Sequence, residues 1–250
     1  VLSRVPFPLE KGDKLRAFNQ IKQLSAKFEV ILFALNDPAT PSNRSDFEML
    51  KKYCSCIEIV NLTWWSIGIN IVKAFFNGIP LQSGYFYSHK ANKTLQKWVA
   101  IHKPDHIYCQ LVRTAEYVKN IKGIPKTIDY MDAFSKGIER RIPKAGLFFK
   151  TILKLEWRRL KKYEAEVFES FDYKTIISLQ DRDHIIHPEN ARIKIVPNGV
   201  DINYFKPAGL EKKYEILFSG NMGYPPNIEA AIYLVKRILP LIKKILPDVR

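Results

Sequence analysis

The residues best placed to bind an anion lie near the start of the chain, after Pro6-Phe7-Pro8. Gly12 stands just before a predicted helix, where a glycine lets backbone N–H groups approach a negatively charged ligand. Asp13 follows, and Lys14 and Arg16 are placed to meet a phosphate or a carboxylate. A simpler alternative is a solvated basic helix start with a turn glycine. The segment is neither a Walker loop nor a GxGxxG fingerprint, which disfavours P-loop and dehydrogenase functions.

Two carboxylates, Asp129 and Asp132, stand at the end of the predicted strand Lys126–Tyr130. In a parallel α/β sheet, side chains at the carboxyl ends of strands face the ligand cleft. We therefore expect Asp129 and Asp132 to be catalytic, because a carboxylate there can bind a hydroxyl group or act as a base. The alternative is that Asp132 only caps the segment that follows.

The elements that must position these residues alternate along the chain between strand-like and amphipathic helical segments. One helix face is formed by residues spaced three apart, from Leu15 to Leu24, and residues 145–171 are predicted to form a long basic helix. This alternation predicts an α/β fold of Rossmann type with a parallel sheet. The predicted strands are Val1–Val5, Phe28–Leu35, Cys56–Leu62, His106–Gln110, Lys126–Tyr130, Lys174–Leu179, Arg192–Val196 and Glu215–Ser219.

A domain boundary is predicted at Asn198-Gly199-Val200-Asp201, because Asn-Gly favours a turn with positive φ. Residues 1–201 would form one complete Rossmann-like domain, with Asn198, Gly199 and Asp201 as its hinge. Residues 202–213 would form a linker. Residues 214–250 would form the first βα unit of a second Rossmann-like domain, with a helix that begins at Pro225-Pro226. The strand-like start and the helical end lead us to expect an N-terminal fragment of a longer protein.

The charge balance predicts a polyanionic partner, because 40 Lys and Arg oppose 25 Asp and Glu, for a net charge of +15. Residues 133–165 carry ten Lys or Arg and three Glu, interleaved with aromatic residues. This pattern is typical of a surface that binds an anionic membrane, or of a solvated helix packed on its own domain. The apolar segment 64–79 could lie on a membrane but is too interrupted to cross one. No nucleic-acid module is recognisable, so we expect no nucleic-acid partner.

Cysteine and histidine patterns predict neither disulfides nor a metal site. The three cysteines, Cys54, Cys56 and Cys109, are irregularly spaced, and the five histidines lack the spacing of metal ligands. We therefore expect a reducing, cytoplasmic setting, no metal and no cofactor.

Several motifs together resemble one family. They are Pro6-x-Pro8…Lys11-Gly12-Asp13-Lys14-x-Arg16, Asp129-Tyr130-x-Asp132, Glu156-x-Arg158-Arg159-Leu160-x-x-Tyr163-Glu164, Asn198-Gly199-Val200-Asp201 and Phe218-Ser219-Gly220-Asn221-Met222…Pro226-Asn227. In this order the chain resembles bacterial family-4 glycosyltransferases of the GT-B fold, and most of all the exopolysaccharide-associated sugar transferases.

The resemblance implies a two-domain enzyme that moves a sugar from a nucleoside diphosphate donor to a lipid-linked or polysaccharide acceptor, with retention and without a metal. The Gly12 loop would contact the donor diphosphate, and Gly220, Asn221 and Asn227 would lie on the donor side. The enzyme would be cytoplasmic and peripheral to the inner membrane face. Asn221 and Asn227 fall near positions where many relatives carry Arg and Lys. The family's paired glutamates would follow Arg250, so we expect the 250-residue chain alone not to turn over.

Two other functions remain open from the sequence. A nucleotide-sugar epimerase of the same fold would need a cluster of carboxylate and histidine side chains in the cleft. A non-catalytic protein would use the basic helix to bind anionic lipid or nucleic acid.

Overall fold

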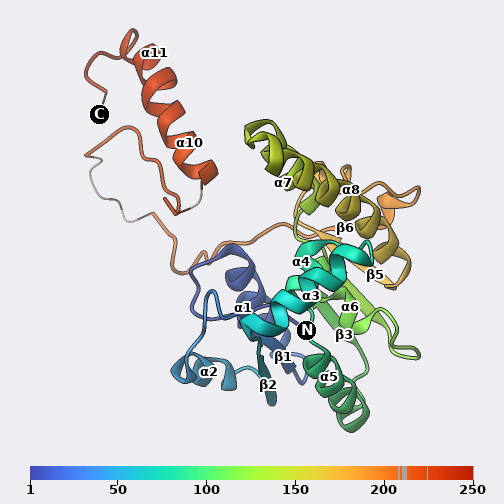
Figure 1. Cartoon of the computed structure of the whole chain (residues 1–250). Coiled ribbons are helices and arrows are strands. Elements are labelled where there is room, and N and C mark those ends of the chain that lie inside the picture. Colours follow the sequence, from blue (N-terminus) through green and yellow to red (C-terminus); the bar gives the residue numbers. More distant parts are fainter. Residues whose placement is uncertain (208, 210–212, 224, 250) are drawn as a thin grey trace. The chain divides into compact units, whose positions relative to one another are not determined.

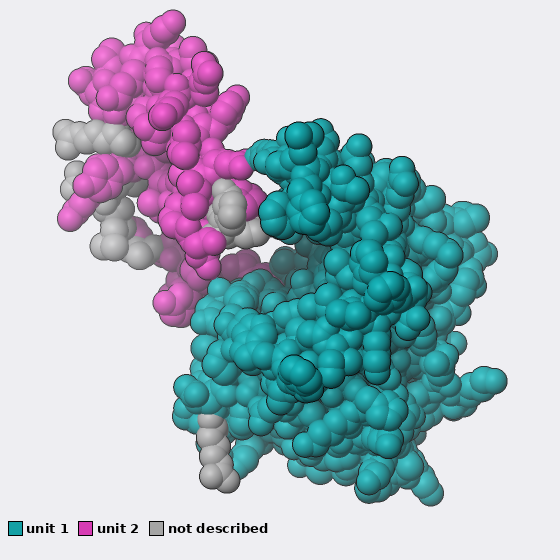
Figure 2. All heavy atoms as spheres, viewed as in Figure 1, with its two compact units in different colours: residues 1–198 teal, residues 199–250 magenta. Residues whose placement is uncertain are grey.

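The computed structural model describes residues 1–207, 209, 213–223 and 225–249 (Figure 1). It divides into two compact units, Val1–Asn198 and Gly199–Arg250 (Figure 2). The predicted linker 202–213 includes four residues outside the described part of the chain, namely 208 and 210–212.

All strands of the first unit run parallel. β1 (Ile31–Asn36) pairs with β2 (Cys56–Asn61), with Ile31 opposite Cys56. A second sheet has the order β3 (Ile107–Gln110), β4 (Lys126–Asp129), β5 (Tyr173–Ile176), β6 (Lys194–Ile195). The prediction of an α/β fold with parallel strands is therefore confirmed.

The first two residues of the chain connect these sheets. The Leu2 N–H donates to the Phe33 carbonyl (2.9 Å), and the Leu35 N–H donates to the Leu2 carbonyl (3.1 Å). On the other side, the Val1 amino group donates to the Tyr108 carbonyl of β3 (2.6 Å). The predicted strand Val1–Val5 is thus reduced to an isolated bridge at Leu2, because the chain bends at residues 3–4 and leaves the sheet.

Helices connect the strands, and two clusters of buried apolar side chains lie between helices and sheets. The predicted long helix is confirmed as α8. The helical elements of this unit are α1 (Gly12–Leu24), α2 (Arg44–Lys51), α3 (Trp64–Phe76), α4 (Leu81–Phe86), α5 (His89–His102), η1 (Val112–Thr114), α6 (Ala115–Val118), α7 (Phe134–Arg141), η2 (Ile142–Lys144), α8 (Leu147–Glu169), α9 (Leu179–Arg182) and η3 (Asn190–Arg192).

Three predicted strands are shorter by two or three residues than the sequence pattern suggested, because local hydrogen bonds compete for their ends. The Phe28 N–H closes the end of α1 by donating to the Leu24 carbonyl. The Ser178 side chain caps α9, and Arg192 belongs to η3. These residues therefore lie outside β1, β5 and β6.

The second unit contains helices but no strand among its described residues. α10 (Pro225–Tyr233) begins at Pro225, as predicted, and continues through a π-helical turn, η4 (Leu234–Ile238), into α11 (Leu239–Lys243). The predicted strand Glu215–Ser219 is wrong. A strand is stable only beside a pairing partner, and the described part of this unit offers none.

Gly84 allows α4 to pack closely against α3. A Cβ atom at Gly84 would lie 2.5 Å from the Ala74 Cβ and 2.9 Å from the Asn70 carbonyl oxygen. We expect Gly84→Ala to lower the free energy of unfolding by about 1–3 kcal/mol through overpacking. Gly68→Ala is the matched control, because nothing lies within 4 Å of its Cβ position in α3. It should raise stability by about 0.5–1 kcal/mol. Urea denaturation measures both, and a Gly84→Ala variant as stable as the parent would contradict this packing.

Candidate functional site

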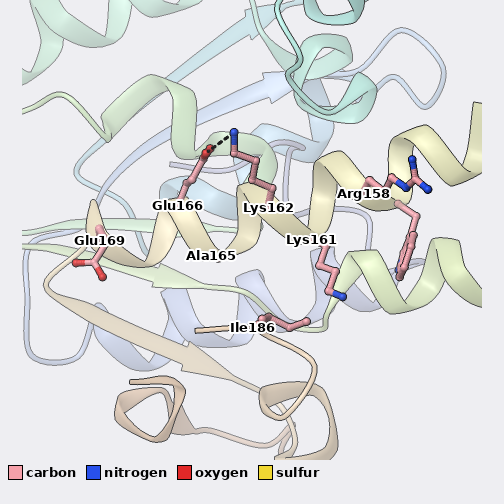
Figure 3. A pocket seen from close by; sticks show the side chains of 8 residues that line it. Arg158, Lys161, Lys162, Ala165, Glu166, Glu169 and Ile186 are labelled. Atoms are coloured by element: carbon pink, nitrogen blue, oxygen red, sulfur yellow. Dashed lines mark ion pairs between the residues drawn. The ribbon is translucent and has the colours of Figure 1, made fainter. Parts of the chain in front are cut away.

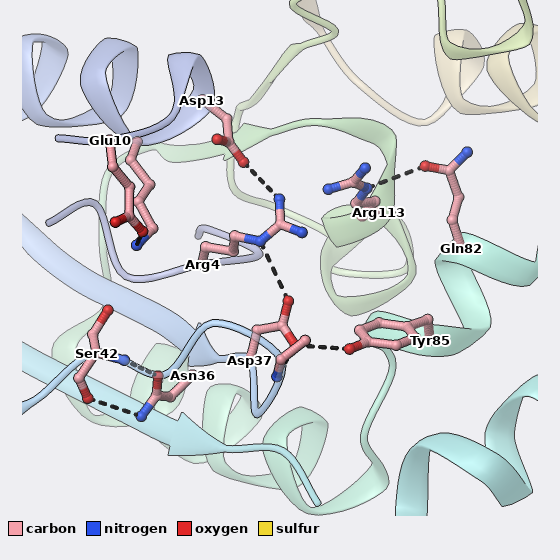
Figure 4. A network of polar contacts seen from close by, with 11 residues as sticks. Arg4, Glu10, Asp13, Asn36, Asp37, Ser42, Gln82, Tyr85 and Arg113 are labelled. Atoms are coloured by element: carbon pink, nitrogen blue, oxygen red, sulfur yellow. Dashed lines mark hydrogen bonds and ion pairs between the residues drawn. The ribbon is translucent and has the colours of Figure 1, made fainter. Parts of the chain in front are cut away.

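Polar side chains gather where the N-terminal segment and β1 leave the sheet. The Arg4 guanidinium reaches between two carboxylates: its Nη1 lies 2.9 Å from Asp13 Oδ2 and its Nε lies 3.4 Å from Asp37 Oδ2 (Figure 4). The Tyr85 hydroxyl donates to Asp37 Oδ1 at 2.8 Å. Burial and this bond raise the pKa of Tyr85 to about 12. We call Arg4, Asp13, Asp37 and Tyr85 the Arg4 cluster.

A second arginine, Arg113, follows β3 and lies beside the Arg4 cluster (Figure 4). Its Nε donates to Gln82 Oε1 at 3.1 Å, the one side-chain hydrogen bond that it makes to a described residue. Its guanidinium carbon lies 4.9 Å from the centre of the Phe86 ring, and that of Arg4 lies 5.1 Å from the same ring. Burial and the charge of Arg4 lower the pKa of Arg113 to about 10, so it stays cationic at neutral pH. Its Nη groups remain able to donate to a ligand.

The start of α1 lies next to these cations and carries no side-chain cap from the described residues. Its first N–H groups have no partner inside the helix, and the helix dipole favours an anion there. Partial burial and the charge of Arg4 lower the pKa of Lys11, the residue before the helix. Gly12 faces open space. Lys14 is buried and pairs with Glu10 at 3.0 Å. The predicted anion-binding start is therefore exposed, with Lys11, Arg4 and Arg113 near it and with Asp13 and Asp37 paired to Arg4.

Two residues with positive φ stand within two residues of the ends of neighbouring strands. Leu111, after β3, has φ of 67°, and Met131, after β4, has φ of 62°. Non-glycine residues pay a conformational cost there, and such strain concentrates at functional sites. The Leu111 N–H donates to the Asp129 carbonyl (2.7 Å) and the Ile177 N–H to the Met131 carbonyl (2.9 Å), which hold both turns. These turns position Arg113 and Asp132.

Asp132 follows the Met131 turn with its side chain exposed. Even so, the surrounding protein withdraws water from the carboxyl group, and Asp181 adds a like charge. Together they raise the pKa of Asp132 to about 6. The alternative that Asp132 only caps the next helix does not hold, because the N-cap residue of α7 is Ala133. The N–H of Ser135, in the first turn of α7, donates instead to the carboxylate of Glu164 at 3.0 Å.

Asp129 and Arg16 come together, 113 positions apart, in a buried ion pair. Arg16 Nε lies 2.7 Å from Asp129 Oδ2, and Nη2 lies 3.3 Å from Oδ1. The Tyr108 hydroxyl (2.9 Å) and the Gln20 amide (3.2 Å) also donate to Oδ2, and the Met131 N–H (3.3 Å) donates to Oδ1. Burial raises the pKa of the Tyr108 hydroxyl, and the negative charge of the neighbouring Asp129 raises it further. Asp129 thus joins β4 to α1 through contacts within the fold.

The predicted hinge residues have different surroundings. The Asn198 side chain accepts a hydrogen bond from Arg16 Nη1 at 2.9 Å. The expected turn with positive φ is wrong, because neither Asn198 nor Gly199 has positive φ. Asn198 instead continues in irregular backbone and uses its side chain to meet Arg16. Asp201 Oδ1 accepts the N–H groups of Asn203 and Tyr204 at 3.0 and 3.2 Å, which closes a short turn.

The predicted donor-side residues form a compact loop within the second unit. Asn221 Oδ1 accepts the Gly223 N–H at 2.8 Å, and the Asn227 amide donates to the Asn221 carbonyl at 3.0 Å. A Cβ at Gly220 would lie 3.0 Å from Asn227 Nδ2, so a larger residue there would displace the Asn227 amide.

Arg4, Asp37, Tyr85 and Arg113 were not among the site residues predicted from the sequence. A signal for two of them was present: Asp37 directly follows β1 and Arg113 comes three residues after β3. The rule that pointed to Asp132, that ligands meet the carboxyl ends of parallel strands, applies equally to both. Arg4 and Tyr85 could not be found this way, because only the fold brings them to this edge.

The fold and site define an α/β protein with parallel sheets that presents arginines, carboxylates and a helix start at the carboxyl edge. No protein-family model matches the chain, and no curated protein matches it either. Within the described ranges, no group of three or more His, Cys, Asp or Glu is placed to hold a metal ion. None of the described helices has the length and apolar character needed to cross a membrane.

Breaking the buried pair should be costly. Asp129→Asn leaves Arg16 charged and buried without its counter-ion, so we expect a loss of about 3–5 kcal/mol in the free energy of unfolding. Asp105→Asn, at an exposed carboxylate, should change it by less than about 0.5 kcal/mol. The double variant Arg16→Met/Asp129→Asn should lose less than Asp129→Asn, because no unpaired charge remains. Chemical denaturation tests this order, and an Asp129→Asn variant of parental stability would refute it.

Asp132 should titrate at an unusual pH. Carbon-13 NMR of its carboxyl group should give a midpoint near 6, against an ordinary value of 3.8, and Asp181→Asn should lower the midpoint by removing a like charge. The control Glu48→Gln, at an exposed helix position, should leave it unchanged.

The same shift predicts a pH dependence of stability. Because the folded state binds this proton more tightly than the unfolded chain, ionisation of Asp132 lowers stability as the pH rises from 3.8 to about 6. Asp132→Asn should remove that part of the pH dependence. A wild-type midpoint near 3.8 would contradict both expectations.

Proposed function

We propose that the protein is a glycosyltransferase of GT-B architecture that moves a sugar from a nucleoside diphosphate donor to a lipid-linked or polysaccharide acceptor. The observation that carries the proposal is the uncapped start of α1 surrounded by Arg4, Lys11 and Arg113 at the carboxyl edge of a parallel sheet. The family resemblance of the motifs adds the reaction class.

The donor diphosphate is the ligand that suits this edge best. Its charge would be balanced by the helix start at Gly12, by Lys11 and by the guanidinium groups of Arg4 and Arg113. Groups fixed in this way stabilise the negative charge that grows on the diphosphate as the sugar leaves. The residues that the family resemblance assigns to the donor side, Gly220, Asn221 and Asn227, belong to the second unit.

Asp132 is proposed to orient the acceptor. In a retaining transfer, the acceptor oxygen bonds to the anomeric carbon on the face from which the diphosphate departs. The bond from that carbon to the diphosphate oxygen breaks, its electron pair stays on the diphosphate, and the diphosphate takes the proton of the acceptor hydroxyl. Asp132, ionised above about pH 6, accepts a hydrogen bond from that hydroxyl and fixes its direction.

The side chains of the site favour transfer over epimerisation. Among the side chains of the described residues, Arg4 and Arg113 contact Asp, Gln and aromatic groups and no histidine. An epimerase of this fold would need a carboxylate and histidine cluster there. The arginines instead suit a substrate with a strongly anionic group.

Nucleoside diphosphate binding is the direct test. Uridine, guanosine and adenosine diphosphates, and pyrophosphate, are titrated against the whole chain by thermal shift and calorimetry. We expect at least one nucleoside diphosphate to raise the melting temperature, because a ligand that binds only the folded state stabilises it. Gly12→Val should weaken binding by about tenfold or more, since it blocks approach to the helix start. Its Cβ meets open space, so the fold should survive.

Arg113→Met should also weaken binding by about tenfold, through the loss of a charge-assisted hydrogen bond. Arg192→Gln is the matched control, because Arg192 is an exposed arginine paired with Glu189. It should leave binding unchanged. If no diphosphate binds, or if Gly12→Val and Arg113→Met bind as the parent does, the assignment of this edge to the donor is wrong.

A further inference from the structure

One face of α3 is apolar and uncovered by the rest of the first unit. Trp65, Ile69, Val72 and Phe76 recur at the spacing of one helix face, and the exposed fractions of Trp65 and Phe76 are 81% and 79%. The opposite face packs inward through Ile67 and Ala74. We call the four outward side chains the α3 ridge. Large aromatic residues so exposed along one helix mark an interaction surface.

The first turns of α8 add a second exposed aromatic group. Leu147, Phe148 and Phe149 have exposed fractions of 90%, 75% and 65%. They precede the half of α8 that packs in the core, whose buried residues begin at Glu156.

Direct contacts hold α8 against the end of α3. Arg159 Nη2 donates to the Phe75 carbonyl at 2.7 Å, and its guanidinium lies 5.1 Å from the Phe75 ring centre. Glu156 Oε2 accepts the Leu81 N–H at 2.8 Å, at the start of α4. The helix whose first turns carry the exposed aromatic group is thus bonded to the end of the helix that carries the α3 ridge.

The two chain segments that carry these aromatic groups contain basic residues and no acidic ones. The sequence contains no Asp or Glu from residue 59 to residue 104, a stretch that includes Lys73 on α3. It contains none from residue 140 to residue 155, where Arg140, Arg141, Lys150 and Lys154 lie. The later half of α8 does contain glutamates. A shallow depression there is lined by Lys162 and Glu166 among others, and Lys162 Nζ lies 3.5 Å from Glu166 Oε1 (Figure 3). The surface without acidic residues thus ends there.

We infer that the α3 ridge and the aromatic start of α8 dock onto an anionic lipid bilayer, with α3 lying in the plane of the interface. Tryptophan and phenylalanine side chains suit the boundary between headgroups and acyl chains, and lysine and arginine beside them attract anionic headgroups. At 13 residues, α3 is too short to span a bilayer. The inference concerns a different surface from the proposed sugar-transfer site and does not depend on that function.

Vesicle co-sedimentation of the whole chain tests the inference. The probes are phosphatidylcholine vesicles with and without about one third phosphatidylglycerol. We expect binding to the anionic vesicles to be about tenfold or more tighter, and to weaken as salt rises. Trp65→Ser/Phe76→Ser should weaken it by about tenfold or more, because two large apolar groups no longer leave water.

The control Phe28→Ser removes an exposed aromatic residue before β1, in the connection from α1. It should bind vesicles as the parent does. Acyl chains brominated near the headgroup should quench tryptophan fluorescence in the parent, and much less in Trp64→Phe/Trp65→Phe, which keeps Trp98 and Trp157. Circular dichroism confirms that each variant is folded.

Four results would overturn the inference: no vesicle binding, equal binding to neutral and anionic vesicles, parental binding by Trp65→Ser/Phe76→Ser, or a lipid-free dimer that these two substitutions dissociate. The last result, measured by sedimentation equilibrium, would assign the α3 ridge to a second copy of the chain. Nucleoside diphosphate binding is measured without lipid. A negative vesicle experiment therefore does not contradict the proposed function, and a negative nucleotide experiment does not contradict the membrane surface.

Discussion

The geometry of the site depends on the buried ion pair between Arg16 and Asp129. An ion pair in the interior is tolerated only when the other hydrogen-bonding capacity of both groups is also met, and here Gln20, Tyr108 and Asn198 do so. The pair joins α1, which begins at Gly12, to β4, which leads into the strained turn before Asp132. The Arg16–Asp129 pair therefore helps to set the distance between the exposed start of α1 and the carboxylate of Asp132.

Helix α8 provides a second constraint, because its carboxylates complete the starts of other helices. Glu156 accepts the N–H groups of Leu81 and Gln82 at 2.8 and 3.3 Å, and Glu164 accepts that of Ser135. Capping in this way satisfies donors that a helix cannot satisfy itself. Since α4 carries Gln82 and Tyr85 to the site, α8 positions these two residues by holding the start of α4. Burial raises the pKa of Glu164 to about 7. The Glu156-to-Glu164 motif thus has a structural explanation that does not depend on the proposed function.

The proposed site and the proposed membrane surface are connected through the packing of α3 on α4. Gly84 brings α4 against Ala74, on the inner face of α3 whose outer face forms the α3 ridge. A protein held on a bilayer by α3 would keep the α4 residues Gln82 and Tyr85 one helix away from the lipid. This arrangement suits a lipid-linked acceptor, whose apolar part stays in the membrane while its head reaches the carboxyl edge of the sheet.

The sequence by itself determined what depends on neighbours along the chain: the alternation of strands and helices, the helix start at Gly12, the long helix α8 and the place of Asp132 after a strand. It misjudged Glu215–Ser219, whose β-propensity has no partner to pair with in the described part of its unit, and the turn at Asn198-Gly199. Only the tertiary structure decided that Arg16 meets Asp129, and that Arg4, Asp37, Tyr85 and Arg113 share one edge. The physical reason is the separation along the chain over which each interaction acts. Helix periodicity and capping act within a few residues, whereas ion pairs and strand pairing join residues far apart in sequence, and one sequence pattern is compatible with many such pairings.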